Sequence, residues 1–211
     1  MAIQMKSRFI VASCTAIVAL GSLATLVRSA DEAKKPSANE QAKMMEMYMK
    51  LAEPGAEHKM LEEQFAGEWE VAVKSCGGDP SGPMVESKAT FKGNMLMGGR
   101  YLGQDYNGRM MDMDYHGMGM MGFDNGNKKY IGAWIDNMST GMMTSEGSYD
   151  ESTKTYTLTG SFNDPSKPDG KGTMRQIIKV TDNDHHQMMM YMPGPDGKEM
   201  LMMDAKYTRK N

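Results

Sequence analysis

The chain of 211 residues carries 24 Lys and Arg against 27 Asp and Glu, which gives a formal net charge of −3. This acidic balance argues against a nucleic-acid partner, because such a partner needs basic side chains that neutralise its phosphates. The length suits one domain with extensions, and 27 methionines make the apolar composition unusual.

The first 30 residues are typical of an export signal peptide. Lys6 and Arg8 precede an apolar run, Phe9–Leu20, and small residues follow that run. A basic start followed by a short apolar segment is the pattern of a chain that leaves the cytoplasm. The sequence therefore predicts a secreted or periplasmic protein.

Cleavage of this signal is expected after Ala24 or Ala30, and both points remain open. An uncleaved anchor is the alternative, since residues 9–27 are just long enough to span a bilayer. A cleaved chain is expected to make no stable insertion into a membrane. Removal of residues 1–30 takes away three basic residues and no acidic ones, so the net charge moves from −3 to −6. Cys76 is then the one remaining cysteine, which excludes an internal disulfide.

Two short helices are predicted before the main domain. Residues 31–40 are charged and poor in apolar side chains, which predicts a disordered spacer. Residues 41–66 hold the helices. In "QAKMMEMYMKLAE" the methionines, a tyrosine and a leucine share one stripe at helical spacing, and Pro54 ends that helix. The second helix, "AEHKMLEEQF", ends before Gly67, a residue type that commonly stops helices.

From Gly67 onward the apolar residues recur at every second position, which predicts strands. In "GEWEVAVKS", Trp69, Val71 and Val73 alternate with charged or small residues. Clusters of Gly, Pro, Asn and Asp then separate about ten strand-like runs, with connections of hairpin size. Such a meander removes its free edges by closing on itself. Residues 67–211 are therefore predicted to form an all-β domain, an antiparallel up-and-down β-barrel.

Several motifs resemble those of known barrel proteins. "FAGEWE" near the start of the domain and "YTRK" near its end resemble the calycin, or lipocalin-like, signature. In that signature a Gly-x-Trp opens the first strand and an Arg on the last strand covers the indole. The resemblance implies these structural roles for Gly67, Trp69 and Arg209, and a stacked Arg and Trp would interact by a cation–π contact.

A longer series of motifs resembles one bacterial family. "PGAEHKML", "GEWE", "MGGRYL", "GFDN", "WID", "SEGSYDE", "LTG", "MYMPGPDGKE" and "YTRK" occur in the order typical of domain-of-unknown-function family 1579 (DUF1579). The similarity runs from about Pro54 to Lys210. It implies an exported barrel with no assigned activity, and the excess of methionine is where this sequence departs from the pattern.

Two strand-like runs, "YHGMGMMGF" and "HHQMMMYMP", each place a histidine and methionines on one face. Imidazole and thioether groups are ligands that Cu(I) prefers. Core packing is the favoured interpretation, because same-face neighbours on a strand lie about 7 Å apart and the two runs are several strands apart. A copper(I) site stays as the alternative, and its candidate ligands are His116, Met118, Met120, His186, Met188 and Met190.

The second run also predicts a register. A hairpin at "PGPDG" is expected to place Met190 opposite Met200 and His186 opposite Asp204. Methionines occupy both faces of "QMMMYM" and "MLMMD". Core packing does not explain the outward ones, so a protein partner is a further possibility at this Met-rich surface.

A candidate pocket comes from the run "YIGAWID". Tyr130, Trp134 and Asp136 share one face, and if that face points inward they supply an aromatic wall and one polar anchor. His116 is a fourth candidate. Beside it, Gly117 and Gly119 leave one face of their strand bare, which permits close packing or a bend.

No motif of a hydrolase, metalloprotease, nucleotide-binding or dinucleotide-binding enzyme is present, and no catalytic residue is predicted. We therefore expect an exported barrel that binds a small apolar or amphipathic molecule and that is not an enzyme. A copper(I)-handling protein and a partner-binding envelope protein are the alternatives. No cofactor is expected, although His116, His185 and His186 are candidate ligands for haem.

Overall fold

The computed structural model describes residues 36–77, 82–110, 112–194 and 196–210. The predicted signal peptide, and the predicted spacer up to residue 35, lie outside the described residues. The described elements are α1 (Ala38–Ala52), α2 (Ala56–Phe65), β1 (Gly67–Ser75), β2 (Val85–Leu96), β3 (Tyr101–Met110), β4 (Met113–Asp124), β5 (Lys129–Asp136), β6 (Met143–Asp150), β7 (Thr155–Asn163), β8 (Lys171–Asp182), β9 (His185–Pro193) and β10 (Glu199–Arg209). None of the helices within these ranges is long and apolar enough to cross a membrane.

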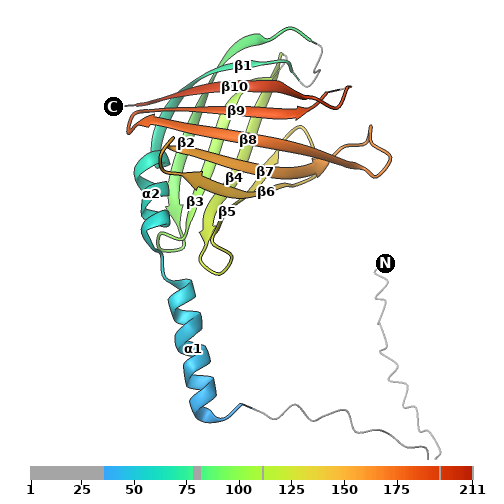
Figure 1. Ribbon diagram of the computed structural model, residues 1–211. Coiled ribbons are helices and arrows are strands. Elements are labelled where there is room, and N and C mark those ends of the chain that lie inside the picture. The colour runs from blue at the N-terminus through green and yellow to red at the C-terminus, as the bar shows by residue number, and fades with distance from the viewer. Residues whose placement is uncertain (1–35, 78–81, 111, 195, 211) are drawn as a thin grey trace, which may run out of the picture.

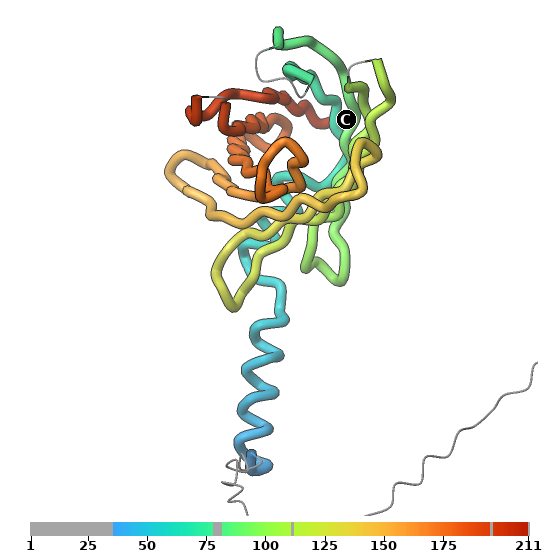
Figure 2. The backbone as a smooth tube through the Cα atoms, turned by 90° about the vertical axis from the view of Figure 1, so that its right-hand side faces the viewer, coloured from blue at the N-terminus to red at the C-terminus, as the bar shows by residue number. Residues whose placement is uncertain are grey.

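The ten strands form one closed barrel in which each strand pairs antiparallel with the next, and β1 closes the ring against β10 (Figures 1 and 2). This confirms the predicted up-and-down barrel. Closure follows from the sequence, because every strand is joined to the next by a short connection and no strand edge is left unpaired. The first and last strands meet in the register that places Trp69 opposite Arg209.

The barrel has a closed end, where α2 lies against it. Leu61 and Phe65 of α2 are buried and pack against Trp69, Leu102 and Tyr156. Inward side chains alternate with outward ones along each strand, as the sequence period predicts. This apolar cluster is the main core of the molecule.

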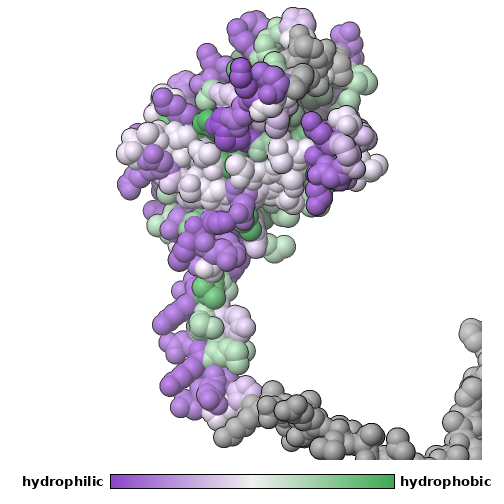
Figure 3. All heavy atoms as spheres, turned by 45° about the vertical axis from the view of Figure 1, so that its right-hand side comes forward, coloured by the Kyte–Doolittle hydropathy of each residue, from purple (hydrophilic) through white to green (hydrophobic). Residues whose placement is uncertain are grey.

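Helix α1 stands away from the barrel and buries none of its side chains (Figures 1 and 2). It begins at Ala38, within the range predicted as spacer, because Ser37 caps it. Glu40 N–H donates to the Ser37 hydroxyl at 3.4 Å, and Ser37 N–H donates to the Glu40 carboxylate at 2.7 Å. Its apolar stripe is exposed, and Figure 3 shows hydrophobic residues among hydrophilic ones along this helix.

The hairpin of β9 and β10 has a different register from the predicted one. Met200 lies opposite Met192, and after a bulge Met203 lies opposite Met190. The turn is centred one residue later than the sequence suggested, and the bulge adds a further residue to β10. His186 therefore lies opposite Tyr207, and the predicted pairs of Met190 with Met200 and of His186 with Asp204 are wrong.

Candidate functional site

A cavity of about 320 Å³ lies inside the barrel. Phe65 of α2 and His186 lie at its inner end, while Arg109, Met138 and Met192 come from the strand ends at the opposite, open end. Methionine is the commonest residue around it. The methionines that line it from β6, β8, β9 and β10 include Met143, Met174, Met188, Met190, Met192 and Met203.

Three aromatic side chains form one wall of this cavity, and we call Tyr106, Tyr115 and Trp134 the aromatic corner. The Tyr106 ring lies 5.7 Å from the Tyr115 ring at 77° and 6.4 Å from the Trp134 ring at 71°. The three rings come from the adjacent strands β3, β4 and β5. Their inclined planes present aromatic surface to the cavity from more than one direction.

A chain of hydrogen bonds fixes this corner. The Trp134 indole N–H donates to the Tyr115 hydroxyl at 3.0 Å, and that hydroxyl donates to the Asp136 carboxylate at 3.1 Å. Burial raises the pKa of Tyr106 to about 12, and burial is also the largest cause that raises the pKa of Tyr115. Both phenols therefore stay protonated at neutral pH.

Two glycines make room for the indole. Gly117 and Gly119 of β4 lie opposite Asp136 and Trp134 of β5. A Cβ atom at Gly117 would lie 2.2 Å from the indole Cζ2, and one at Gly119 would lie 2.7 Å from its Cε3. The indole therefore lies directly against the backbone of β4. Of the two outcomes that the bare face of "HGMGM" permits, close packing or a bend, the structure shows close packing.

The structure brings together two of the four predicted pocket residues. Trp134 and Asp136 line the cavity. Tyr130 is buried in the core, with its ring 4.8 Å from that of Tyr156. His116 is exposed on the outer face of β4, with Nε2 3.4 Å from an Asp105 carboxylate oxygen. The pocket residues that the sequence analysis missed include Tyr106, Tyr115, Gln104 and Gln176.

The two histidine and methionine runs lie on opposite surfaces of the barrel wall. Met118 and Met120 are 48% and 50% exposed and share the outer face of β4 with His116, and Met120 also contributes to the cavity lining. His186 and Met188 are buried inside. The structure therefore does not unite the six candidate copper ligands. Within the described ranges, no group of three or more His, Cys, Asp or Glu side chains is arranged to hold a metal ion.

His186 is the one candidate haem ligand that lines the cavity. His116 lies on the outer face, and the exposed His185 contacts Asp182 at 2.8 Å. The His186 ring stacks on Tyr207 at 4.2 Å, and Trp69 packs against it at 4.5 Å. Its Nδ1 has no hydrogen-bond partner among the described residues, and burial lowers its pKa to about 3.

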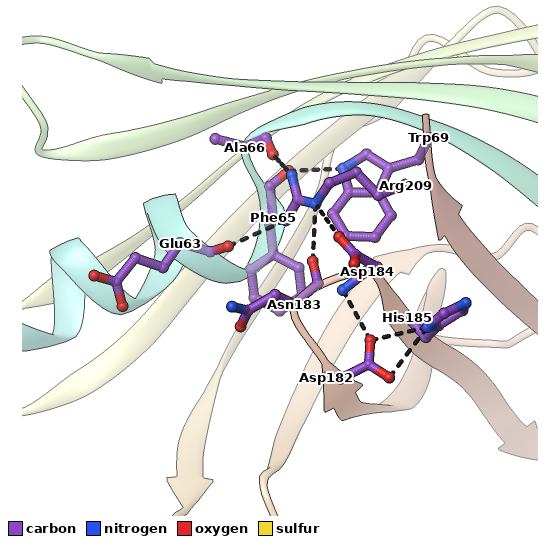
Figure 4. A network of polar contacts seen from close by, with 9 residues as sticks. All are labelled: Glu63, Phe65, Ala66, Trp69, Asp182, Asn183, Asp184, His185 and Arg209. Carbon is purple, nitrogen blue, oxygen red and sulfur yellow. Dashed lines mark hydrogen bonds and ion pairs between the residues drawn. The ribbon is translucent and has the colours of Figure 1, made fainter. Parts of the chain in front are cut away.

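Arg209 covers Trp69 at the closed end, as the signature implied. Its guanidinium carbon lies 4.1 Å from the centre of the indole ring. The same side chain donates to backbone carbonyls of Glu63, Ala66 and Asn183 (Figure 4). Gly67 has a φ of 110°, and a Cβ there would lie 2.8 Å from the guanidinium. These residues close the barrel and lie outside the candidate site.

A more open hollow of about 760 Å³ lies on the outer face of β5 to β10. Its charged groups already have partners. Arg175 donates to Glu199 at 2.8 Å and lies 4.6 Å from the centre of the Tyr191 ring. We place the candidate site in the interior cavity, because its lining is mostly apolar and Tyr115 and Asp136 form a hydrogen-bonded polar pair on one wall.

The fold and sequence place the chain among known proteins. Residues 53–209 match the family described as "Protein of unknown function (DUF1579)". No curated protein matches the sequence. The crystal structure of Rv2717c from M. tuberculosis is similar to this structure, with a TM-score of 0.55 and 12% sequence identity. The match covers 75% of this chain and 100% of that chain, and this likeness concerns the fold alone. Because the family match covers most of the chain, and the closed barrel is consistent with a calycin-like fold, the protein belongs to the DUF1579 family.

Proposed function

We propose that this protein is an exported carrier or sensor barrel that binds a small apolar or amphipathic molecule in its interior. The observation that carries this proposal is the interior cavity of about 320 Å³, open at one end, with methionines around it. Methionine side chains are flexible and polarisable, so they adapt to ligands of different shape. An apolar cavity with a few polar groups is the usual form of a small-molecule site.

The polar groups of the cavity support an amphipathic ligand. Asp136 and Tyr115 are joined by a hydrogen bond on one wall, and Gln104 and Gln176 also line the cavity. The remaining lining is largely methionine, aliphatic and aromatic side chains. A molecule fits this lining when its polar end lies beside Asp136 and Tyr115 and its apolar body lies among the methionines.

A surface for a protein partner is the second candidate. Met118, Met120 and Ile135 are 48%, 50% and 47% exposed on the neighbouring strands β4 and β5. Large apolar side chains that gather on one outer face are typical of interaction surfaces. Met118 and Ile135 are exposed and lie outside the cavity lining, which includes Met120, so the two functions are compatible.

Binding of the neutral fluorescent probe N-phenyl-1-naphthylamine tests the interior site. We expect saturable fluorescence enhancement with the native protein and at least about tenfold weaker binding by Met190→Arg, which introduces a charge among the cavity methionines. Met118→Arg is the matched control, because Met118 is exposed on the outer face, and its binding is expected to be unchanged. Met192→Arg, at the strand end, replaces Met190→Arg if that variant does not fold.

Two results would overturn the proposal. The first is the absence of probe binding by the native protein. The second is an equal loss of binding in the inner variant and the outer control, since this would place the probe somewhere other than the cavity. Thermal unfolding of each variant shows that a loss of binding comes from a folded protein.

A further inference from the structure

The aromatic corner has the geometry of a site for a positively charged group. The Tyr106 ring lies edge-to-face with Tyr115, at 5.7 Å and 77°, and with Trp134, at 6.4 Å and 71°, and all three residues line the cavity. The face of an aromatic ring carries partial negative charge and attracts an ammonium group within about 6 Å. Ring faces that border a cavity therefore attract a large and weakly hydrated cation, such as a quaternary ammonium group.

Asp136 adds a full negative charge to this corner. Its carboxylate is half-buried and accepts hydrogen bonds from the Tyr115 hydroxyl at 3.1 Å and from the Met138 backbone N–H at 3.0 Å. None of the ion pairs within the described ranges includes Asp136. Arg109 also lines the cavity, but its guanidinium is exposed and donates to the Asp112 carbonyl at 2.6 Å.

The indole orientation supports the same conclusion. Gly117 and Gly119 hold one side of the Trp134 ring against the backbone of β4. Trp134 also lines the cavity, so the ring is supported from the wall and fixed by its hydrogen bond to Tyr115. A rigid aromatic surface loses little side-chain entropy when a ligand binds to it.

We propose that the preferred ligands of this cavity are hydrophobic cations. A trialkylammonium headgroup lies against the aromatic corner beside Asp136, and an apolar tail extends among Met188, Met190 and Met203. This inference rests on the proposed function and adds the charge of the ligand to it. An anionic headgroup in the same position would be repelled by the carboxylate.

Titration of the full-length protein with three eight-carbon probes tests the inference. The probes are octyltrimethylammonium, octanol and octanoate, each below its micelle concentration, and the readouts are calorimetry and tryptophan fluorescence. Trp69 is buried under Arg209, so ligand-dependent fluorescence reports on Trp134. We expect octyltrimethylammonium to bind at least about tenfold more tightly than octanol, and octanoate to bind most weakly.

Matched variants locate the headgroup. Asp136→Asn is expected to weaken octyltrimethylammonium about tenfold and to change octanol by less than about twofold, because it removes the charge and retains a hydrogen-bond acceptor. Trp134→Leu is expected to have the same selective effect. Asp105→Asn is the control, because Asp105 contacts His116 on the outer face of the barrel, and it is expected to leave all three affinities unchanged.

The outcomes separate this inference from the function on which it rests. If octanol or octanoate binds as tightly as octyltrimethylammonium, the inference about charge is overturned and the ligand-binding barrel stands. If Asp136→Asn weakens all three probes equally, the headgroup is not beside Asp136 and the inference also fails. If none of the three probes binds, the inference is overturned, and the proposed function is overturned with it when N-phenyl-1-naphthylamine does not bind either.

Discussion

At the scale of single residues, Trp69 and Arg209 contribute to stability and not to ligand binding. Trp69 is fully buried, and its indole N–H donates to the Phe65 carbonyl at 3.1 Å. We expect Trp69→Ala to lower the free energy of unfolding by about 3–5 kcal/mol, as for other large buried aromatic residues. Arg209→Ala is expected to cost less, because the guanidinium is partly exposed. Urea unfolding measures both, and unchanged melting temperatures combined with lost ligand binding would contradict these roles.

His186 predicts a loss of stability in acid. Its pKa falls from 6.5 to about 3 in the folded state because of burial, with a further contribution from Arg209. In the unfolded chain His186 therefore binds a proton below about pH 6.5, whereas in the folded chain it stays neutral down to about pH 3. The stabilisation from neutral His186 is complete above pH 6.5. It decreases as the pH falls from 6.5 to 3, by up to about 1.4 kcal/mol per pH unit.

The variant His186→Phe tests this dependence, because it keeps an aromatic ring and removes the titrating group. We expect the free energy of unfolding of the native protein to fall more steeply between pH 7 and pH 4 than that of the variant. His185→Phe, at the exposed neighbouring residue, is the control. Because this variant retains His186, its free energy of unfolding is expected to fall more steeply with decreasing pH than that of His186→Phe. A constant difference between the native protein and His186→Phe over this range would show that His186 does not titrate in this way.

The sequence predicted part of the site and missed the rest for a physical reason. Trp134 and Asp136 were identified because a strand period and an aromatic-plus-carboxylate pattern occur in the same short run. Tyr106 has the correct period relative to Leu102, but polar residues and glycines surround it and hide the alternation. His116 was predicted to lie in the pocket, yet it is exposed and shares its strand face with the exposed residues Met118 and Met120.

At the scale of elements, the contact between β4 and β5 sets the shape of the pocket. Gly117→Ala would place a Cβ 2.2 Å from the Trp134 ring, so the indole must move. We expect this variant to shift the fluorescence emission of Trp134 and to weaken binding of N-phenyl-1-naphthylamine about tenfold or more, while the barrel still folds.

The double variant Gly117→Ala, Trp134→Leu relieves the clash, and the loss of stability in the two single variants is expected to be non-additive. Additive effects would show that the two residues are not in contact.

The phase of each strand was more predictable than the pairing between strands. Alternation of apolar residues gave the inward face of β1 directly, since Trp69, Val71 and Val73 are all buried. The β9–β10 register depends on a turn and a bulge, and no side-chain pattern in "MLMMD" marks which methionine is the extra residue. With methionine on both faces, each register buries similar side chains, and the sequence alone does not discriminate between them.

At the scale of the whole molecule, closure of the barrel separates the methionines into two populations. Most inner ones line the cavity, most outer ones are exposed on β4 and α1, and Met120 and Met138 are both exposed and part of the cavity lining. A sequence shows how many methionines there are, but their division between the two surfaces depends on strand phase around the entire ring. This is why the two similar histidine and methionine runs, in β4 and β9, have opposite orientations.

This separation leads to a prediction about copper. Replacement of an inner pair, Met188 and Met190, or an outer pair, Met118 and Met120, by Leu keeps the apolar volume and is expected to cost less than about 1.5 kcal/mol per residue. We expect no tight binding of one Cu(I) ion per chain by the native protein, because same-face ligands on one strand lie about 7 Å apart and the other run is across the wall. Titration with Cu(I) against a competing chelator measures the affinity and stoichiometry of binding.

Binding of one ion per chain that is lost in the inner variant, while its melting temperature is retained, would favour a copper site inside the barrel. The same loss in the outer variant would place the metal on the surface of β4, so the two pairs distinguish both forms of the alternative from core packing.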